Sequence, residues 1–150
     1  MKKILFISLI ILYILILPAY PQQNVNVEIK PGVGLGNIVQ LFDTFDPDSW
    51  GSNYTKTIFV KYCYTYKYPS YGLRIDINDN NSVFFISVES SIYQTKEGIK
   101  VGSGMDDVLL FYGNPSTSQK TNDGGYLLYY NGIMFSIGSN KIVKEIGIFN

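Results

Sequence analysis

The chain has 150 residues with 12 basic and 12 acidic side chains, and this balance disfavours nucleic acid, whose phosphates call for a basic surface. It contains no histidine, which removes the commonest general base, the usual serine and cysteine triads and most zinc sites. A single cysteine, Cys63, cannot form an intramolecular disulfide, so the core alone must hold the fold.

The N-terminus has the pattern of a secretory signal peptide. Lys2 and Lys3 precede an apolar run over residues 4–17, followed by Pro18 and Ala19. The run is shorter than the roughly 20 residues that cross a bilayer as a helix. We predict a signal peptide at residues 1–19, cleaved after Ala19, and a secreted or periplasmic bacterial protein with no membrane anchor after cleavage. An anchor that stays uncleaved is the alternative.

Cleavage leaves 131 of the 150 residues, with 10 basic and 12 acidic side chains and a net charge of −2. Residues 25–29 alternate between apolar and polar side chains, which predicts a strand. Apolar side chains at 38, 39, 41 and 42 have helical spacing, and Asn37 is the predicted N-cap. Residues 43–53 indicate a loop, 57–68 a strand, and 72–77 with 83–89 a hairpin.

A second helix is predicted between Ser103 and Gly113. Ser103 is the expected N-cap, with Asp106 three residues later as in a capping box. Apolar side chains at 105, 108, 109 and 112 lie on one helical face, and Gly113 can take a left-handed C-cap conformation. The residues that follow, up to 150, predict strands.

The two halves of the chain repeat one pattern. Six residues recur sixty positions later without a gap: Tyr66, Gly72, Ile77, Asn80, Val83 and Ile86 correspond to Tyr126, Gly132, Ile137, Asn140, Val143 and Ile146. We therefore predict an α+β fold of two tandem repeats, over residues 24–93 and 94–150. Each repeat is expected to be a short helix plus a three-stranded antiparallel meander, with the helices packed on one face of the sheet.

Several motifs of the second half carry a family resemblance. They are Gly-Ile-x-Val-Gly, Asp-Asp-Val, Tyr-Gly-x-Pro, Gly-Ile-x-Phe and Val-x-x-Ile-x-Ile, all within residues 97–150. The pattern resembles secreted bacterial proteins of the SmpA/OmlA and β-lactamase-inhibitor-like groups, and extends more weakly over 25–90. The resemblance implies repeated helix-and-meander units that act by binding other proteins. The chain differs from the outer-membrane-assembly members in lacking the cysteine to which lipid is attached.

Candidate sites for cofactors, metals and catalysis are weak. The glycines at 32, 34 and 36 fit a tight turn better than a dinucleotide-binding turn. The acidic and amide residues at 76–81 start like a calcium loop but lack its glycine and its final glutamate. Asp106 and Asp107 are adjacent on the predicted helix and point to different sides of it. We predict no enzyme, no cofactor and no metal, with a small carboxylate-dependent hydrolase as a second alternative.

One face of the predicted sheet is too apolar for an ordinary solvent-facing surface. The repeat aligns Tyr66 and Tyr68 with Tyr126 and Leu128, and the leucine favours the core for that side of the strand. Alternation then puts Lys67, Asp76 and Glu145 on the opposite face among aromatic residues. We predict that this face binds another protein of the envelope or exterior, through Tyr71, Arg74, Phe85, Leu127, Tyr129, Met134 and Phe149. The alternatives are that another segment covers it, or that Tyr62 and Tyr64 stack on a cell-wall glycan.

Overall fold

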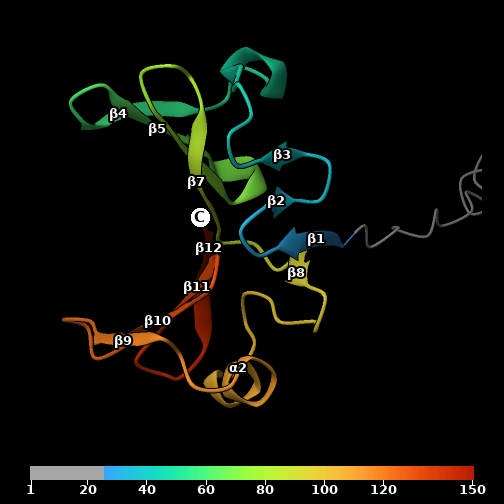
Figure 1. Cartoon of the computed structure of the whole chain (residues 1–150), viewed down its shortest axis with the longest axis vertical. Coiled ribbons are helices and arrows are strands. Elements are labelled where there is room, and N and C mark those ends of the chain that lie inside the picture. The colour runs from blue at the N-terminus through green and yellow to red at the C-terminus, as the bar shows by residue number, and fades with distance from the viewer. Residues whose placement is uncertain (1–25) are drawn as a thin grey trace, which may run out of the picture.

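A computed structural model describes residues 26–150, so the predicted signal peptide lies outside the described residues. The fold is built mainly from strands, arranged in two sheets (Figure 1). The smaller sheet has the order β3-β2-β1-β8: β3 is Val39–Gln40, β2 Gly34–Leu35, β1 Val27–Lys30 and β8 Tyr93–Thr95. Its strands are antiparallel except that β1 and β8 run parallel.

The larger sheet has eight antiparallel strands in the order β4-β5-β6-β7-β12-β11-β10-β9. The first four are β4 (Thr55–Val60), β5 (Cys63–Tyr68), β6 (Leu73–Ile77) and β7 (Val83–Val88). The last four are β9 (Thr117–Lys120), β10 (Tyr126–Tyr130), β11 (Ile133–Ile137) and β12 (Val143–Ile148). Two four-stranded meanders thus meet at the β7–β12 pair in the middle of one sheet.

The predicted α+β fold of two helix-plus-meander repeats is wrong. Within residues 26–150 the one α-helix is α2, Met105–Tyr112, beside two 3-10 turns, η1 (Pro47–Trp50) and η2 (Pro69–Tyr71). Each meander of the large sheet has four strands instead of three. The protein is therefore mostly β, and a second sheet takes the place of the first predicted helix.

The segment predicted as the first helix contains β3, and its burial alternates along the chain although its apolar side chains have helical spacing. Val39 and Leu41 are buried, whereas Ile38 and Phe42 are exposed, which is the period of a strand. At Gly34 a Cβ would clash with the Val39 carbonyl oxygen, so glycine lets β2 and β3 lie this close. The Phe42 N–H then donates to the Val83 carbonyl and ties this segment to β7.

Helix α2 begins one residue later than predicted. Gly104 is its N-cap, and the Asp107 carboxylate accepts the Gly104 N–H at 3.1 Å. Ser103, the expected cap, instead accepts the Lys100 N–H through Oγ. The acidic side chain that closes the first turn is therefore Asp107 and not Asp106.

The hairpins of the two meanders have the same register at an offset of sixty residues. Leu73 pairs with Val88 and Ile75 with Ile86, as Ile133 pairs with Ile148 and Phe135 with Ile146. The register also shifts at the same place, after residue 76 in one hairpin and after residue 136 in the other. The sequence similarity between the halves therefore corresponds to equivalent strand positions in the structure.

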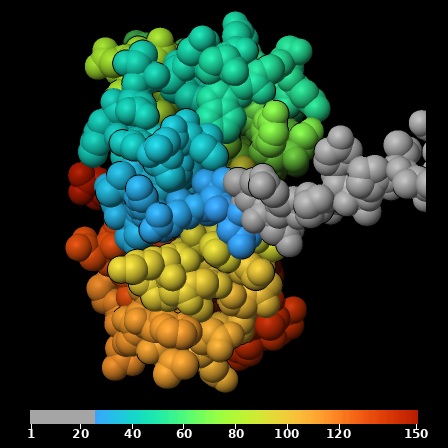
Figure 2. Space-filling view, turned by 90° about the vertical axis from the view of Figure 1, so that its right-hand side faces the viewer, coloured from blue at the N-terminus to red at the C-terminus, as the bar shows by residue number. Residues whose placement is uncertain are grey.

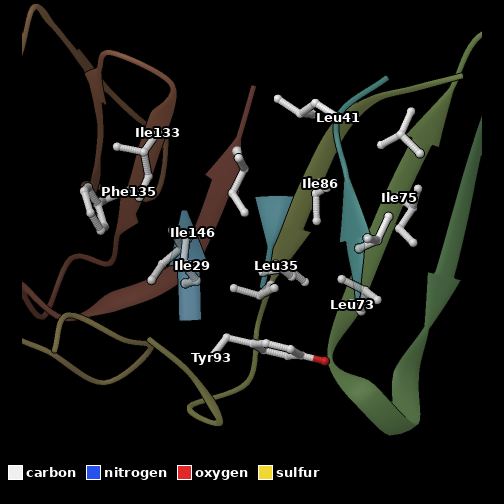
Figure 3. Packing of buried hydrophobic residues seen from close by; sticks show 14 of the residues in the cluster. Ile29, Leu35, Leu41, Leu73, Ile75, Ile86, Tyr93, Ile133, Phe135 and Ile146 are labelled. Atoms are coloured by element: carbon white, nitrogen blue, oxygen red, sulfur yellow. The ribbon is translucent and has the colours of Figure 1, made fainter. Parts of the chain in front are cut away.

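The core lies between the large sheet on one side and the small sheet with α2 on the other (Figure 1). Ile29 and Leu35 of the small sheet face Ile75, Ile86 and Ile146 of the large one (Figure 3). Tyr66 and Tyr68 are buried on this same inner face, as predicted, at 4% and 1% exposure. Figure 2 shows the side of the molecule on which β1–β3, the segment around residues 90–100 and α2 cover the sheet. The opposite side of the large sheet carries the candidate site.

Candidate functional site: the outer face of the large sheet

The outer face is the side of the large sheet that points away from the small sheet and α2. Cross-strand pairing places a row of side chains along it from β5 to β10, each beside the next: Lys67, Arg74, Ser87, Gly147, Met134 and Tyr129. In Figure 1, β1, β2, β3, β8 and α2 all lie on the other side of the sheet. No element within residues 26–150 is therefore stacked on the outer face.

Most of the predicted binding residues lie on this face, but one does not. Arg74, Phe85 and Phe149 lie together in one cleft, while Leu127, Tyr129 and Met134 extend the face along β10 and β11. Tyr71 belongs to η2 and packs against Trp50, with ring centroids 6.3 Å apart, in a separate hollow beside β1 and β8. The alternation rule misplaced Tyr71 because the 3-10 turn interrupts the strand before it.

The cleft has a volume of about 720 Å³ and is mainly aromatic. Five phenylalanines, an ion pair and the last residue line it: Phe42, Phe59, Phe84, Phe85, Phe149, Arg74, Asp76 and Asn150. Phe42 and Phe59 are 64% and 55% exposed, which is unusual for rings of this size. Phe59 lies on β4, and Phe42 follows β3 at the end of the small sheet.

Arg74 and Asp76 form an ion pair in the cleft through two hydrogen bonds. Arg74 donates through Nε to Asp76 Oδ1 at 2.9 Å and through Nη2 to Oδ2 at 2.6 Å. The Thr65 hydroxyl donates to the same Oδ1 at 2.7 Å, from the neighbouring strand. These hydrogen bonds to Asp76 raise the pKa of Arg74 above its ordinary value. The cleft thus contains two opposite charges that compensate each other.

Aromatic rings flank the guanidinium of Arg74. Its central carbon lies 5.7 Å from the ring centroid of Phe59 and 5.4 Å from that of Phe85, within range of cation–π attraction. Arg74 Nη1 donates to no partner within residues 26–150. A ligand in the cleft could accept a hydrogen bond from Nη1 while its apolar part lies against the rings.

The middle of the outer face is shaped by the absence of a side chain at Gly147. A Cβ there would lie 2.9 Å from Phe85 Cζ and 3.0 Å from Met134 Cε. Phe85 and Met134 therefore lie over the backbone of β12, and Met134 is left only 8% exposed. Beside them Ser87 is 1% exposed, and its Oγ makes no hydrogen bond to any described residue.

The alternative sites from the sequence are placed elsewhere. Lys56 Nζ lies 4.1 Å from the ring centroid of Tyr64, so a cation already occupies one face of that ring, while Tyr62 lies exposed at the end of the β4–β5 hairpin. Asp106 and Asp107 are exposed on α2, away from the cleft. Among the described residues no three histidine, cysteine or acidic side chains gather as a metal site would require.

Sequence reasoning missed Phe42, Phe59 and Phe84 as parts of the cleft. Phe59 alternates with Thr55 and Thr57, which pair with outer-face residues of β5, so continuing that alternation could have found it. Phe84 is the extra residue where β6 and β7 shift register. Nothing local indicates Phe42, since only the pairing of its N–H with β7 brings it to the cleft.

Comparison with known proteins identifies no family. No protein-family model matches the chain, and no curated protein does. Among solved structures, the chain is similar to the crystal structure of the uncharacterized protein YfeY from Escherichia coli, with a TM-score of 0.46 and 14% sequence identity. The alignment covers 65% of this chain and 80% of that one. This likeness is too distant to carry an argument about function, and the resemblance to the SmpA/OmlA and β-lactamase-inhibitor-like groups stays a prediction.

None of the helices within residues 26–150 is both long and apolar enough to span a membrane.

Proposed function

We propose that the protein binds another protein through the outer face of its large sheet, with the aromatic cleft receiving an apolar side chain of the partner. The observation that supports this most is the gathering of five phenylalanines, two of them more than half exposed, on a face that no described element covers. A clustered apolar surface of this kind loses contact with water when a partner covers it.

The chemistry of the cleft favours a protein partner over a charged small molecule. Arg74 and Asp76 neutralise each other, so the side chains that line the cleft carry no net charge to attract an anion or a cation. Aromatic residues and arginine are the side chains most enriched at energetically dominant positions of protein interfaces. Tyr129 and Phe149, with ring centroids 6.3 Å apart, continue the aromatic surface beyond the cleft.

The partner is proposed to be a protein of the bacterial envelope or exterior. This part of the proposal depends on the predicted signal peptide at residues 1–19. The protein is proposed to act without catalysis and without a cofactor.

Crosslinking in the envelope and culture medium of the producing organism, followed by mass spectrometry, tests the proposal. The bait is the purified protein beside two variants, Phe42→Asn and Phe111→Asn. Phe42 lies in the cleft at a positive φ of 70°, which asparagine accepts, so this change removes the ring without straining the backbone. Phe111 is a comparably exposed phenylalanine on α2 and serves as the matched control.

We expect a protein that is captured by the parent and by Phe111→Asn but not by Phe42→Asn. Phe149→Ser, on the other side of the cleft, should lose the same protein. Equal capture by all four forms would place the interaction elsewhere on the molecule. If the parent captures no protein, the proposal is wrong.

A further inference from the structure

Phe42 occupies a backbone position that has a counterpart in the second half of the chain. The Phe42 N–H donates to the Val83 carbonyl at 2.7 Å, and the Gly102 N–H donates to the Val143 carbonyl at 2.9 Å. These two hydrogen bonds are related by the same offset of sixty residues that relates the two hairpins. Phe42 and Gly102 also share a positive φ, 70° and 98° respectively. The two residues are therefore equivalent in the structure, although one carries a ring and the other has no side chain.

The backbone conformation at this position favours glycine. A positive φ brings the Cβ of an L-residue close to its own backbone, so a bulky side chain there is rare and lowers stability. A Cβ at Gly102 would meet no atom within 4 Å, so glycine is not needed there to make space. What glycine supplies at position 102 is the freedom to adopt this φ. Phe42 adopts the same region without that freedom, and its backbone is therefore strained.

The Phe42 ring does not offset this strain by packing in the core. It is 64% exposed, and within residues 26–150 it belongs neither to the buried core cluster nor to the partly buried side chains that pack against that cluster. The ring instead lines the cleft, together with Phe59 and Phe85. Strained residues of this kind persist mainly at functional sites, where the side chain has a use that the fold itself does not require.

We propose that Phe42 is kept in the first half of the chain for its ring, as the dominant contact between the cleft and its partner, at the expense of stability. This inference rests on the proposed function, because it assigns the main binding residue of that same cleft. A ring held in place by its backbone loses little freedom on binding, while it gains contact with an apolar side chain of the partner. Where the first half has Phe42 and Phe85, the second half has Gly102 and Glu145, so the strained ring occurs only beside the cleft.

Phe42→Gly separates a binding role from a structural one, because it should weaken binding without weakening the fold. The variant relieves the backbone strain, so urea unfolding followed by Trp50 fluorescence should give a midpoint no lower than that of the parent. Phe42→Ala also removes the ring but keeps a Cβ, and it should unfold at a lower urea concentration than Phe42→Gly. Gly102→Ala introduces the strain at the equivalent position, so it should lower the midpoint and leave partner binding unchanged.

Binding is measured by calorimetric titration of each form with the purified protein that crosslinks to the parent. Phe42→Gly should bind that protein at least about tenfold more weakly than the parent and Gly102→Ala do. A smaller loss of affinity, or a urea midpoint below that of the parent, overturns the inference. If Phe149→Ser loses the protein while Phe42→Gly retains it, the cleft remains the binding site and only the role of Phe42 is wrong. If the parent captures no protein, the proposed function and this inference are both wrong.

Discussion

We predict that removing Arg74 and removing Asp76 lower the free energy of unfolding by different amounts, because the two side chains are buried to different degrees. The Asp76 side chain is 2% exposed, whereas that of Arg74 is 29% exposed. Removing one member of a buried pair leaves the other uncompensated, which costs about 3–5 kcal/mol. The partner left behind decides the cost: Arg74 can still reach water, but Asp76 cannot.

Asp76→Ala should therefore lower the free energy of unfolding by about 3 kcal/mol, the low end of that range. It leaves Arg74 unpaired but partly hydrated, and it removes the acceptor of the Thr65 hydroxyl. Arg74→Met should cost about 4 kcal/mol, because it leaves a buried carboxylate with a single neutral donor. The double variant, Arg74→Met with Asp76→Ala, should lose less unfolding free energy than the sum of the two single losses, since it leaves no charge unpaired.

Urea unfolding measured by the fluorescence of Trp50 provides the assay. Trp50 is the only tryptophan of the chain, and its ring lies 5.8 Å from that of Tyr68, so unfolding changes its surroundings. The reasoning fails if Asp76→Ala costs more than Arg74→Met, or if the double variant equals the sum of the single ones. Either result would mean that burial does not set the energy of this pair.

Four further outcomes follow from the structure. Gly147→Ala should cost about 1–3 kcal/mol in urea unfolding, because the added methyl group displaces the side chains above it, and unchanged stability would contradict that packing. Phe135→Ala, at a position with 0% exposure, should cost about 3–5 kcal/mol by the same assay, and a loss near zero would place Phe135 outside the core. Asp107→Ala should lower the unfolding temperature by more than Asp106→Ala, because both lose a charge but only Asp107 accepts the Gly104 N–H. Burial raises the pKa of Tyr112 to about 12, so the folded protein holds the phenolic proton more tightly than the unfolded chain. The stabilisation from this proton is present below about pH 10 and should be lost as the pH rises toward 12. Absorbance titration of tyrosinate together with urea unfolding can check this.

The sequence predicted the hairpins and their two faces because alternation with a period of two is a local property. In β6 the residues Leu73, Ile75 and Ile77 point to the core, and those between them point outward. The same alternation at an offset of sixty residues gave the equivalent hairpin of β11 and β12. Wherever a strand runs without interruption, parity was enough to assign the face.

Local pattern could not decide the structure of 38–42. An apolar run of five residues is too short for its spacing to separate a helix from a strand, so the choice depends on distant partners. Here the Val83 carbonyl accepts the Phe42 N–H, and Gly34 admits the β3 backbone at close range. The predicted α+β class was wrong because the helix at residues 38–42 was inferred from spacing alone.

The cleft itself could be predicted only in part, for a similar reason. Arg74, Phe85 and Phe149 come from strands whose faces alternation assigns, and the prediction included them. Phe42 approaches from the small sheet, and Tyr71 is turned away by η2. A tertiary contact with no counterpart in a short stretch of sequence places Phe42, whereas a local turn that breaks the alternation places Tyr71.

The correspondence between the two hairpins also explains why the described residues form one such cleft instead of two. Positions that are equivalent at the offset of sixty have changed chemistry: Arg74 corresponds to Met134, Asp76 to Ser136 and Phe85 to Glu145. The second hairpin thus keeps the inner-face residues that build the core but lacks the ion pair and the ring that form the cleft. Because the backbone register is the same in both, side-chain identity and not strand geometry creates the site. A partner that uses the cleft is therefore expected to bind at one copy per chain, which titration of the isolated complex would measure directly.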